Sequence, residues 1–378
     1  MTIRIPRLVV AIAMVTAMAL PVSAQQTIGI SLDYMGYSFD EGLGADAASL
    51  LMIPLAIRFP VGSSMTVDLY SAYAQGKVER GDTEYTLQGV VDTQVKLSYQ
   101  WSDWALFSLG VGIPTGNSTH DSEEAVVSAI LSTDLLGFGE TTWGTGFSVT
   151  PAIATAIRAG DFGIGIAGAY AANGEFTPAA DLDLQYQPGN EGRVRVGIDR
   201  NFGNSTFTAG LTLMTYAQDR ADGQNLFQSG NRTRVDATYM FRAGAGIWTV
   251  YAADLWRQNG DLTLSVVDDL GTPVGDTIIT TAKQNLLVAG VVGTISVGGS
   301  YVFRPQIDLK YQVREEADGR DEGSGWIVAA GGDFPVRLFG GYDFFPKARV
   351  MFGSIIDPVG EAVSVLGGEF SGTLRWGF

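Results

Sequence analysis

The sequence has no cysteine and only one histidine, His120, among its 378 residues. The lack of cysteine excludes disulfide bonds and thiol chemistry. A single histidine cannot form a His cluster for zinc or iron. A Ser-His catalytic pair would have to use His120, which has no nucleophile motif around it. We therefore expect no catalytic residues, no metal and no cofactor.

The chain is also poor in positive charge and in long apolar runs. Its net charge of −16 argues against nucleic acid as a partner. A membrane-spanning helix needs about 20 consecutive apolar residues, and no segment after residue 24 reaches that length. At the start of the sequence, Arg4 and Arg7 precede the apolar run Leu8 to Leu20, and Val22-Ser23-Ala24 follows that run. This pattern predicts a cleaved signal peptide over residues 1–24, and a mature chain of residues 25–378.

The rest of the chain alternates between apolar and polar residues at period two. One segment places Leu309 and Tyr311 on one face and Asp308 and Lys310 on the other. Because charges return to a single face, a helix does not explain the pattern, and the inner faces of a soluble sandwich would be apolar. The alternation instead predicts strands of a transmembrane barrel, with apolar side chains towards lipid and polar ones towards the lumen.

Sixteen segments show this pattern, and bacterial single-chain barrels have an even number of strands. We therefore predict an all-β fold, a transmembrane antiparallel up-and-down β-barrel of about sixteen strands, with fourteen as the alternative. The predicted strands cover residues 27–37, 49–59, 64–75, 86–100, 104–113, 141–157, 161–173, 191–201, 206–217, 230–243, 246–258, 283–296, 298–313, 323–334, 340–355 and 364–378. Short turns alternate with long loops, among them 76–85 and 259–282.

The last predicted strand ends on Trp376, Gly377 and Phe378. A terminal strand with an apolar outer face and a final aromatic residue resembles the closing strand of bacterial outer-membrane barrels. That resemblance implies location in the cell outer membrane and contact with its lipid and lipopolysaccharide. It also implies that Phe378 and Trp376 form the signal read by the barrel assembly machinery.

The third long connection, residues 114–140, contains a predicted short helix. Asp121 is a suitable cap, and Glu123 and Glu124 lie near the positive end of the helix. Its apolar residues recur at helical spacing, and small side chains take inward parity on the flanking strands. We expect this loop to insert into the lumen as a constriction. A helical cap outside the mouth is the alternative. The positions at helical spacing are Ala125, Val126, Ala129, Ile130 and Thr133.

Basic side chains take inward parity on later strands and define the predicted pore lining. They are Arg193, Arg195, Arg232, Arg234, Arg242, Arg304, Lys310, Lys347, Arg349 and Arg375. Acidic side chains with the same predicted parity are Asp199, Asp236, Asp254, Asp308, Asp343 and Glu369. Ion pairing that stiffens the wall is one interpretation. The other is a transverse field, in which Glu123, Glu124 and Asp134 of the loop face the arginines and anionic solutes are favoured.

Three short motifs resemble a group of outer-membrane transporters. They are Gly110-Val-Gly-Ile-Pro114-Thr-Gly116, Tyr186-Gln-Pro-Gly189 and Tyr342-Asp-Phe-Phe-Pro346. The group is the phenol-degradation meta-pathway transporters, which are distantly similar to the long-chain fatty-acid channel. The resemblance implies transport of hydrophobic or aromatic compounds. Our chain differs in its sixteen predicted strands and in being too short for an amino-terminal hatch.

The sequence thus predicts an outer-membrane channel for passive uptake of small solutes, with anions favoured. The alternatives are a gated transporter of hydrophobic or aromatic compounds and a structural or adhesive barrel that conducts nothing. The expected partners are membrane lipid, the assembly machinery and a small-molecule solute.

Overall fold

The computed structural model describes residues 26–40, 43–181, 183–267, 273–298, 301–318, 321–338, 341–357 and 360–377. The predicted signal peptide, residues 1–24, and the terminal Phe378 lie outside the described residues.

Sixteen antiparallel strand positions form one closed barrel, as predicted, and fourteen is wrong. Each position pairs with its neighbours in the chain, and β1 closes the barrel by pairing with both β2 and β23. The positions are β1 (Thr27–Phe39), β2 (Ala47–Val61), β3 (Met65–Arg80), β4 and β5 together (Thr83–Val90, Thr93–Ser102), β6 (Ala105–Ile113), β7 (Ser148–Ala159), β8 (Phe162–Asn173), β10 (Glu191–Phe202), β11 (Ser205–Tyr216), β14 (Arg232–Ala243), β15 (Gly246–Arg257), β18 (Gln284–Gly298), β19 (Tyr301–Arg314), β20 and β21 together (Gly323–Asp333, Val336–Arg337), β22 (Tyr342–Ile356) and β23 (Ala362–Gly377).

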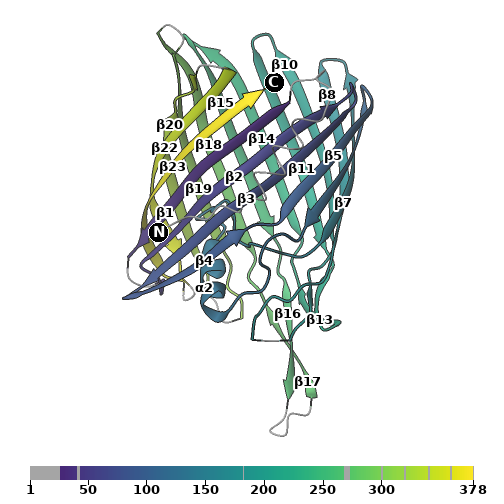
Figure 1. Ribbon diagram of the computed structural model, residues 1–378, viewed down its shortest axis with the longest axis vertical. Helices are drawn as coiled ribbons and strands as arrows, with labels where there is room; N and C mark the ends of the chain where they lie inside the picture. Colours follow the sequence, from purple (N-terminus) through teal and green to yellow (C-terminus); the bar gives the residue numbers. More distant parts are fainter. Residues whose placement is uncertain are drawn as a thin grey trace.

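The two ends of the barrel differ (Figure 1). Tight turns such as 203–204 and 244–245 close one end, where β23 also finishes. The other end carries the long loops and is called the long-loop end below. It holds the helix α2 (Ser122–Leu131) and a small sheet outside the barrel. That sheet consists of β9 (Tyr186–Gln187), β12 (Gln218–Ala221), β13 (Gln224–Gln228), β16 (Asp261–Val267) and β17 (Pro273–Thr280). Among the described residues, no helix is both long and apolar enough to cross a membrane.

Side chains alternate across the barrel wall as the period-two pattern predicts. On β23, Leu366 and Phe370 point outward and are 64% and 53% exposed, whereas Val365 and Glu369, each one residue earlier, face the interior. A closed barrel satisfies every backbone hydrogen bond between strands, which the hydrocarbon core of a membrane requires. An apolar outer face around such a barrel is the pattern of outer-membrane proteins, and the chain is an outer-membrane β-barrel.

The predicted strand 86–100 is wrong in one respect, because it breaks at Val91 and Asp92. The parity reverses there. Lys96 of β5 faces inward as predicted, but Leu87 of β4 also faces inward and is fully buried. The Asp92 carboxylate accepts backbone N–H bonds from Gly116 (3.0 Å) and Thr145 (2.8 Å). The pairing with β3 continues past this point but shifts by one residue between Tyr73–Val90 and Tyr70–Gln94, which is a β-bulge and accounts for the reversed parity.

Three other predicted boundaries are also wrong. Residues 76–85, predicted as a loop, form the β3–β4 hairpin that extends the wall at the long-loop end. Most of the predicted loop 259–282 folds into the β16–β17 hairpin. The predicted strand 141–157 begins only at Ser148, because Trp143 is buried in the loop. Its indole Nε1–H donates to the Ala74 carbonyl at 3.0 Å.

Candidate functional site: the barrel lumen

The predicted helix of the β6–β7 loop is confirmed as α2, and Asp121 is its cap. The Asp121 carboxylate accepts from the backbone N–H of Glu123 (2.9 Å) and of Glu124 (2.8 Å). Glu124 in turn accepts from the Asp121 backbone N–H at 3.2 Å, which completes a capping box. Both glutamates lie in the first turn, where the helix dipole stabilises negative charge. The presence of acidic residues at positions 123 and 124 therefore has a local structural reason, the stabilisation of the helix.

α2 packs against the apolar inner face of β2, β3 and β4. Val127 and Leu131 are fully buried, whereas Ala125 and Ala129 of the predicted stripe are exposed. Gly76 on β3 permits this contact, because a Cβ there would lie 2.7 Å from a methyl of Leu131. The wall that receives the helix is thus apolar, and the expectation that it would be the wall of small side chains is wrong.

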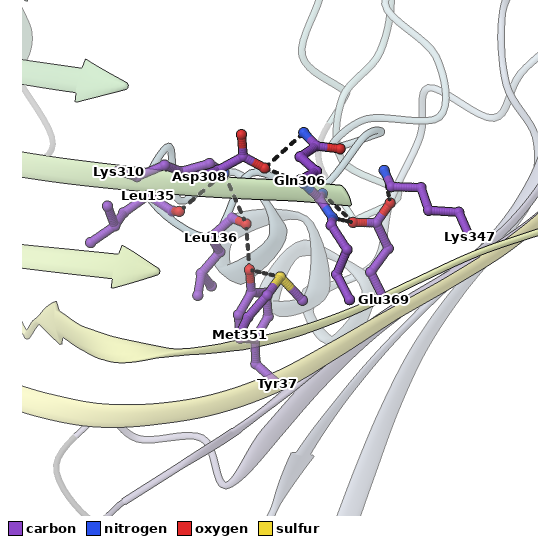
Figure 2. Close-up of polar contacts among 10 residues, drawn as sticks. Tyr37, Leu135, Leu136, Gln306, Asp308, Lys310, Lys347, Met351 and Glu369 are labelled. Carbon is purple, nitrogen blue, oxygen red and sulfur yellow. Dashed lines mark hydrogen bonds and ion pairs between the residues drawn. The ribbon is translucent and has the colours of Figure 1, made fainter. Parts of the chain in front are cut away.

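Residues 134–138 of the loop reach inward-facing side chains of β1, β15, β19 and β22. Leu135, Leu136 and Phe138 are buried in one cluster with Tyr37 and Met351. The Tyr37 hydroxyl donates to the Leu136 carbonyl at 2.9 Å (Figure 2). The Lys310 ammonium donates to the carbonyls of Leu135 (3.3 Å) and Leu136 (3.4 Å). Residues 134–138, called the loop tip below, therefore lie within the lumen.

Charged contacts also tie the loop to the wall. Asp134 pairs with Arg257 of β15 at 2.9 Å. Sequence reasoning missed Arg257 because it gave inward parity to Asp254, which places Arg257 on the outer face. Burial raises the pKa of the Glu140 carboxyl, although hydrogen bonds with the backbone of Thr142 and Thr141 oppose this. Glu123, Glu124 and Asp134 do not pair with the arginines that they were predicted to face.

One side of the lumen carries a network of paired charges on β19, β22 and β23 (Figure 2). Arg349 joins two carboxylates: its Nη1 donates to Asp308 and its Nε to Glu369, each at 2.6 Å. Lys347 donates to Glu369, also at 2.6 Å. Nearer the short turns, Arg304 pairs with Asp333 (2.5 Å) and Arg375 with Asp343 (3.4 Å). Because these charges balance, the network stiffens the wall and contributes little net field.

The opposite side of the lumen has an excess of positive charge. A cavity of about 580 Å³ extends along the inner faces of β5–β8, β10, β11 and β14. Small side chains form part of it, including Ser108, Ala152, Ala154, Ala167 and Ala169, and the basic ones are Lys96, Arg193, Arg195, Arg232 and Arg234. The small residues that were predicted to receive the helix therefore border open space.

These five basic side chains, called the basic wall below, are only partly paired. Arg193 binds Glu191 at 2.5 Å, and Arg195 binds Asp236 through two hydrogen bonds of 2.7 and 2.8 Å. Arg234 lies 3.7 Å from the same Asp236. In the part of the chain that the structure describes, neither Lys96 nor Arg232 has a carboxylate oxygen within 4.0 Å. Period-two alternation gives Lys96 inward parity together with Gln94 and Ser98, but the predicted pore lining did not include it.

Two predicted charges lie elsewhere. Arg242 is on the inward face of β14 but pairs in register with Ile247 beside a short turn, far along the strand from Arg232 and Arg234. Asp254 is on the outer face of β15, so its predicted inward parity is wrong. The neighbouring Leu255 lines the cavity, and Asp254 lies opposite the outward Val235.

Comparisons with known proteins give a general likeness to outer-membrane barrels. No protein-family model matches the chain, and no curated protein matches its sequence. Among solved structures, an anion-selective porin from Comamonas acidovorans is 13% identical, with a TM-score of 0.40 over 94% of this chain and 99% of that one. The outer-membrane channel DcaP of Acinetobacter baumannii is 10% identical, with a TM-score of 0.43 over 94% and 98%. OmpT of Vibrio cholerae is 11% identical, with a TM-score of 0.42 over 95% and 99%. At these values the likeness carries no argument about solute or selectivity.

Proposed function

We propose that the protein is an outer-membrane channel for passive diffusion of small solutes, that it prefers anions, and that loop 114–140 narrows its lumen. The basic wall is the observation that carries the proposal. Five cations border the main cavity, and among the residues that the structure describes only Glu191 and Asp236 lie within pairing distance of them.

Unpaired cations in a narrow pore act on passing ions at short range. The Debye length is about 8 Å at physiological salt, so charges closer than this to the solute path are incompletely screened. A ring or wall of Arg and Lys is the usual means by which a pore favours anions. The paired network on the opposite side adds no comparable field, because each of its carboxylates has a cationic partner.

The loop tip supplies the narrowing in this proposal. It is bound to the wall by Lys310, Tyr37 and Arg257, so it holds a defined position in the lumen. Solutes then pass between the loop and the basic wall. The proposed partners are the membrane lipid around the barrel, lipopolysaccharide, and the assembly machinery that reads Trp376 and Phe378.

Single-channel conductance in planar bilayers tests this function. The purified protein should conduct ions, and deleting Asp121 to Leu136 should raise its conductance, because α2 and most of the tip are removed together. The matched control deletes residues 220–225, the turn of the β12–β13 hairpin outside the barrel, and should leave conductance unchanged. If the first deletion leaves the conductance unchanged, the loop is not the constriction.

Transport of hydrophobic or aromatic compounds is the second candidate, and it rests on the resemblance to the phenol-pathway group. It predicts a barrel that barely conducts ions in bilayers. The charged lumen favours the first candidate, because apolar solutes gain nothing from arginine side chains. A structural barrel would conduct nothing, with or without the loop.

A further inference from the structure

A second cavity, of about 220 Å³, lies between the loop tip and the paired network. It is called the recess below. Its polar lining includes Tyr251, Gln306, Asp308 and Lys310, and its apolar lining includes Met35 and Ile327. One buried water needs only about 10–15 Å³ of such space, so the recess is larger than a water site. It is smaller than the pockets of about 300–1,000 Å³ that take drug-sized ligands.

Asp308 lines this recess and, among the described residues, has one acceptor atom without a donor. The side chain is only 9% exposed, and its Oδ2 is occupied by Arg349 (2.6 Å) and Gln306 (2.8 Å). In the part of the chain described by the structure, its buried Oδ1 has no hydrogen-bond partner. Buried carboxylate oxygens are normally satisfied, so this atom indicates a missing donor.

Gly290 lies between Tyr251 and Asp308 in the strand register and lets their side chains approach each other. A Cβ at this position would lie 2.5 Å from Asp308 Oδ1 and 2.5 Å from the Tyr251 hydroxyl. The two oxygens therefore lie over the same point of the wall. Any larger residue at position 290 would displace both of them.

Lys310 provides the complementary charge. Its ammonium has three N–H donors, and two of them go to the Leu135 and Leu136 carbonyls. The third is available to an anionic group in the recess. Divalent cations fit poorly, because Lys310 and Arg349 both line this space and would repel them.

We propose that the recess is a binding subsite for a small monocarboxylate with a hydroxyl or ammonium group on the carbon next to the carboxylate. The ligand carboxylate binds Lys310. The hydroxyl or ammonium donates to Asp308 Oδ1 beside the Tyr251 hydroxyl, and the carbon chain lies on Met35 and Ile327. Arg349 and Gln306 hold Asp308 in position. The subsite deepens the proposed function only in that the ligand enters through the lumen.

Isothermal calorimetry on the purified, detergent-solubilised barrel tests the subsite without requiring conduction. The probes are 2-hydroxypropanoate, 2-aminopropanoate and, as the acid without the second donor, propanoate. At least one of the first two should bind about threefold to tenfold more tightly than propanoate, the range that one hydrogen bond supplies. Which of them binds more tightly identifies the donor as hydroxyl or ammonium.

Two variants place the binding in the recess. Tyr251→Phe should reduce the preference over propanoate by a similar factor, and Gly290→Ala should abolish binding by displacing Asp308 Oδ1 and the Tyr251 hydroxyl. Tyr216→Phe is the matched control, because Tyr216 faces the lumen beside Arg232 and outside the recess. Equal binding of all three acids, or equal loss in Tyr216→Phe, would overturn the subsite. If the subsite is overturned but the protein conducts ions, the proposed function stands. If the protein binds the probes but does not conduct ions, only the proposed function is overturned.

Discussion

At the scale of single residues, the direction of a side chain decides what its charge does. Arg195 and Asp236 face the lumen, where they pair with each other in a polar interior. Asp254 faces outward among apolar neighbours, and one of its carboxylate oxygens is buried without a partner in the described residues. Arg200 also faces outward, but it lies at the short-turn end. There its guanidinium stacks over Phe162 (4.8 Å) and Phe202 (4.6 Å).

Asp254→Leu should therefore stabilise the barrel. A charged side chain facing lipid costs up to about 2–4 kcal/mol for Arg or Lys at the midplane and less for Asp, so we expect a gain on the order of 1 kcal/mol. Urea unfolding in lipid vesicles, followed by tryptophan fluorescence, measures this change.

Asp236→Leu is the matched control for that substitution. Asp236 lies one strand away but points inward, and its loss leaves Arg195 without its carboxylate, so the control should lower stability. A loss of stability in Asp254→Leu as well would show that Asp254 has a partner in the membrane, such as a neighbouring copy of the chain.

Much of the residue scale could be predicted from period-two alternation. Every basic residue of the predicted pore lining that borders the main cavity has the inward parity that it was given, from Arg193 to Arg234. Prediction from alternation fails where the inward parity reverses within a strand. It assigned Leu87 and Val91 to the lipid face, because no local signal reveals the parity reversal at Asp92.

At the scale of elements, the position of α2 depends on one residue without a side chain. Gly76 lies under the helix, and a Cβ there would meet Leu131, Val127 and Trp143 at 2.7, 2.9 and 3.1 Å. The helix could be predicted from its capping box, since that signal is local. The wall on which the helix packs could not be predicted, because the apolar faces of β2, β3 and β4 have the same alternating sequence pattern as the other strands.

Gly76→Leu should detach α2 from the wall and leave the barrel intact. The larger side chain occupies the space of Leu131 and Val127, so the β6–β7 loop should become sensitive to added protease. Cleavage within residues 114–147 measures this, and heat-modifiable migration on gels reports the barrel itself.

Gly29→Leu is the matched control for the helix contact. Gly29 also faces the lumen, but no atom lies within 4 Å of the position of its Cβ. This variant should remain as resistant to protease as the unmodified protein. Equal resistance of Gly76→Leu would contradict the packing described for α2.

At the scale of the whole molecule, the barrel could be predicted because its constraint is global. Sixteen alternating segments must close to satisfy their backbone groups, so errors in single boundaries do not change the architecture. The distribution of charge around the lumen could not be predicted. It depends on which strands face each other across the barrel, and on Asp134 pairing with Arg257 instead of facing the basic wall.

The reversal potential across a salt gradient tests the central claim, that the basic wall makes the channel prefer anions. The unmodified protein should show an anion-selective potential. Replacing Arg193, Arg195, Arg232 and Arg234 with Gln should shift it towards cations, more strongly at low salt, where screening is weaker. The control replaces Arg304 and Arg375, which pair with Asp333 and Asp343 in the balanced network, and should shift it less. A potential that is unchanged by the four substitutions would contradict the account, and the arginines would then be structural partners of their acidic neighbours.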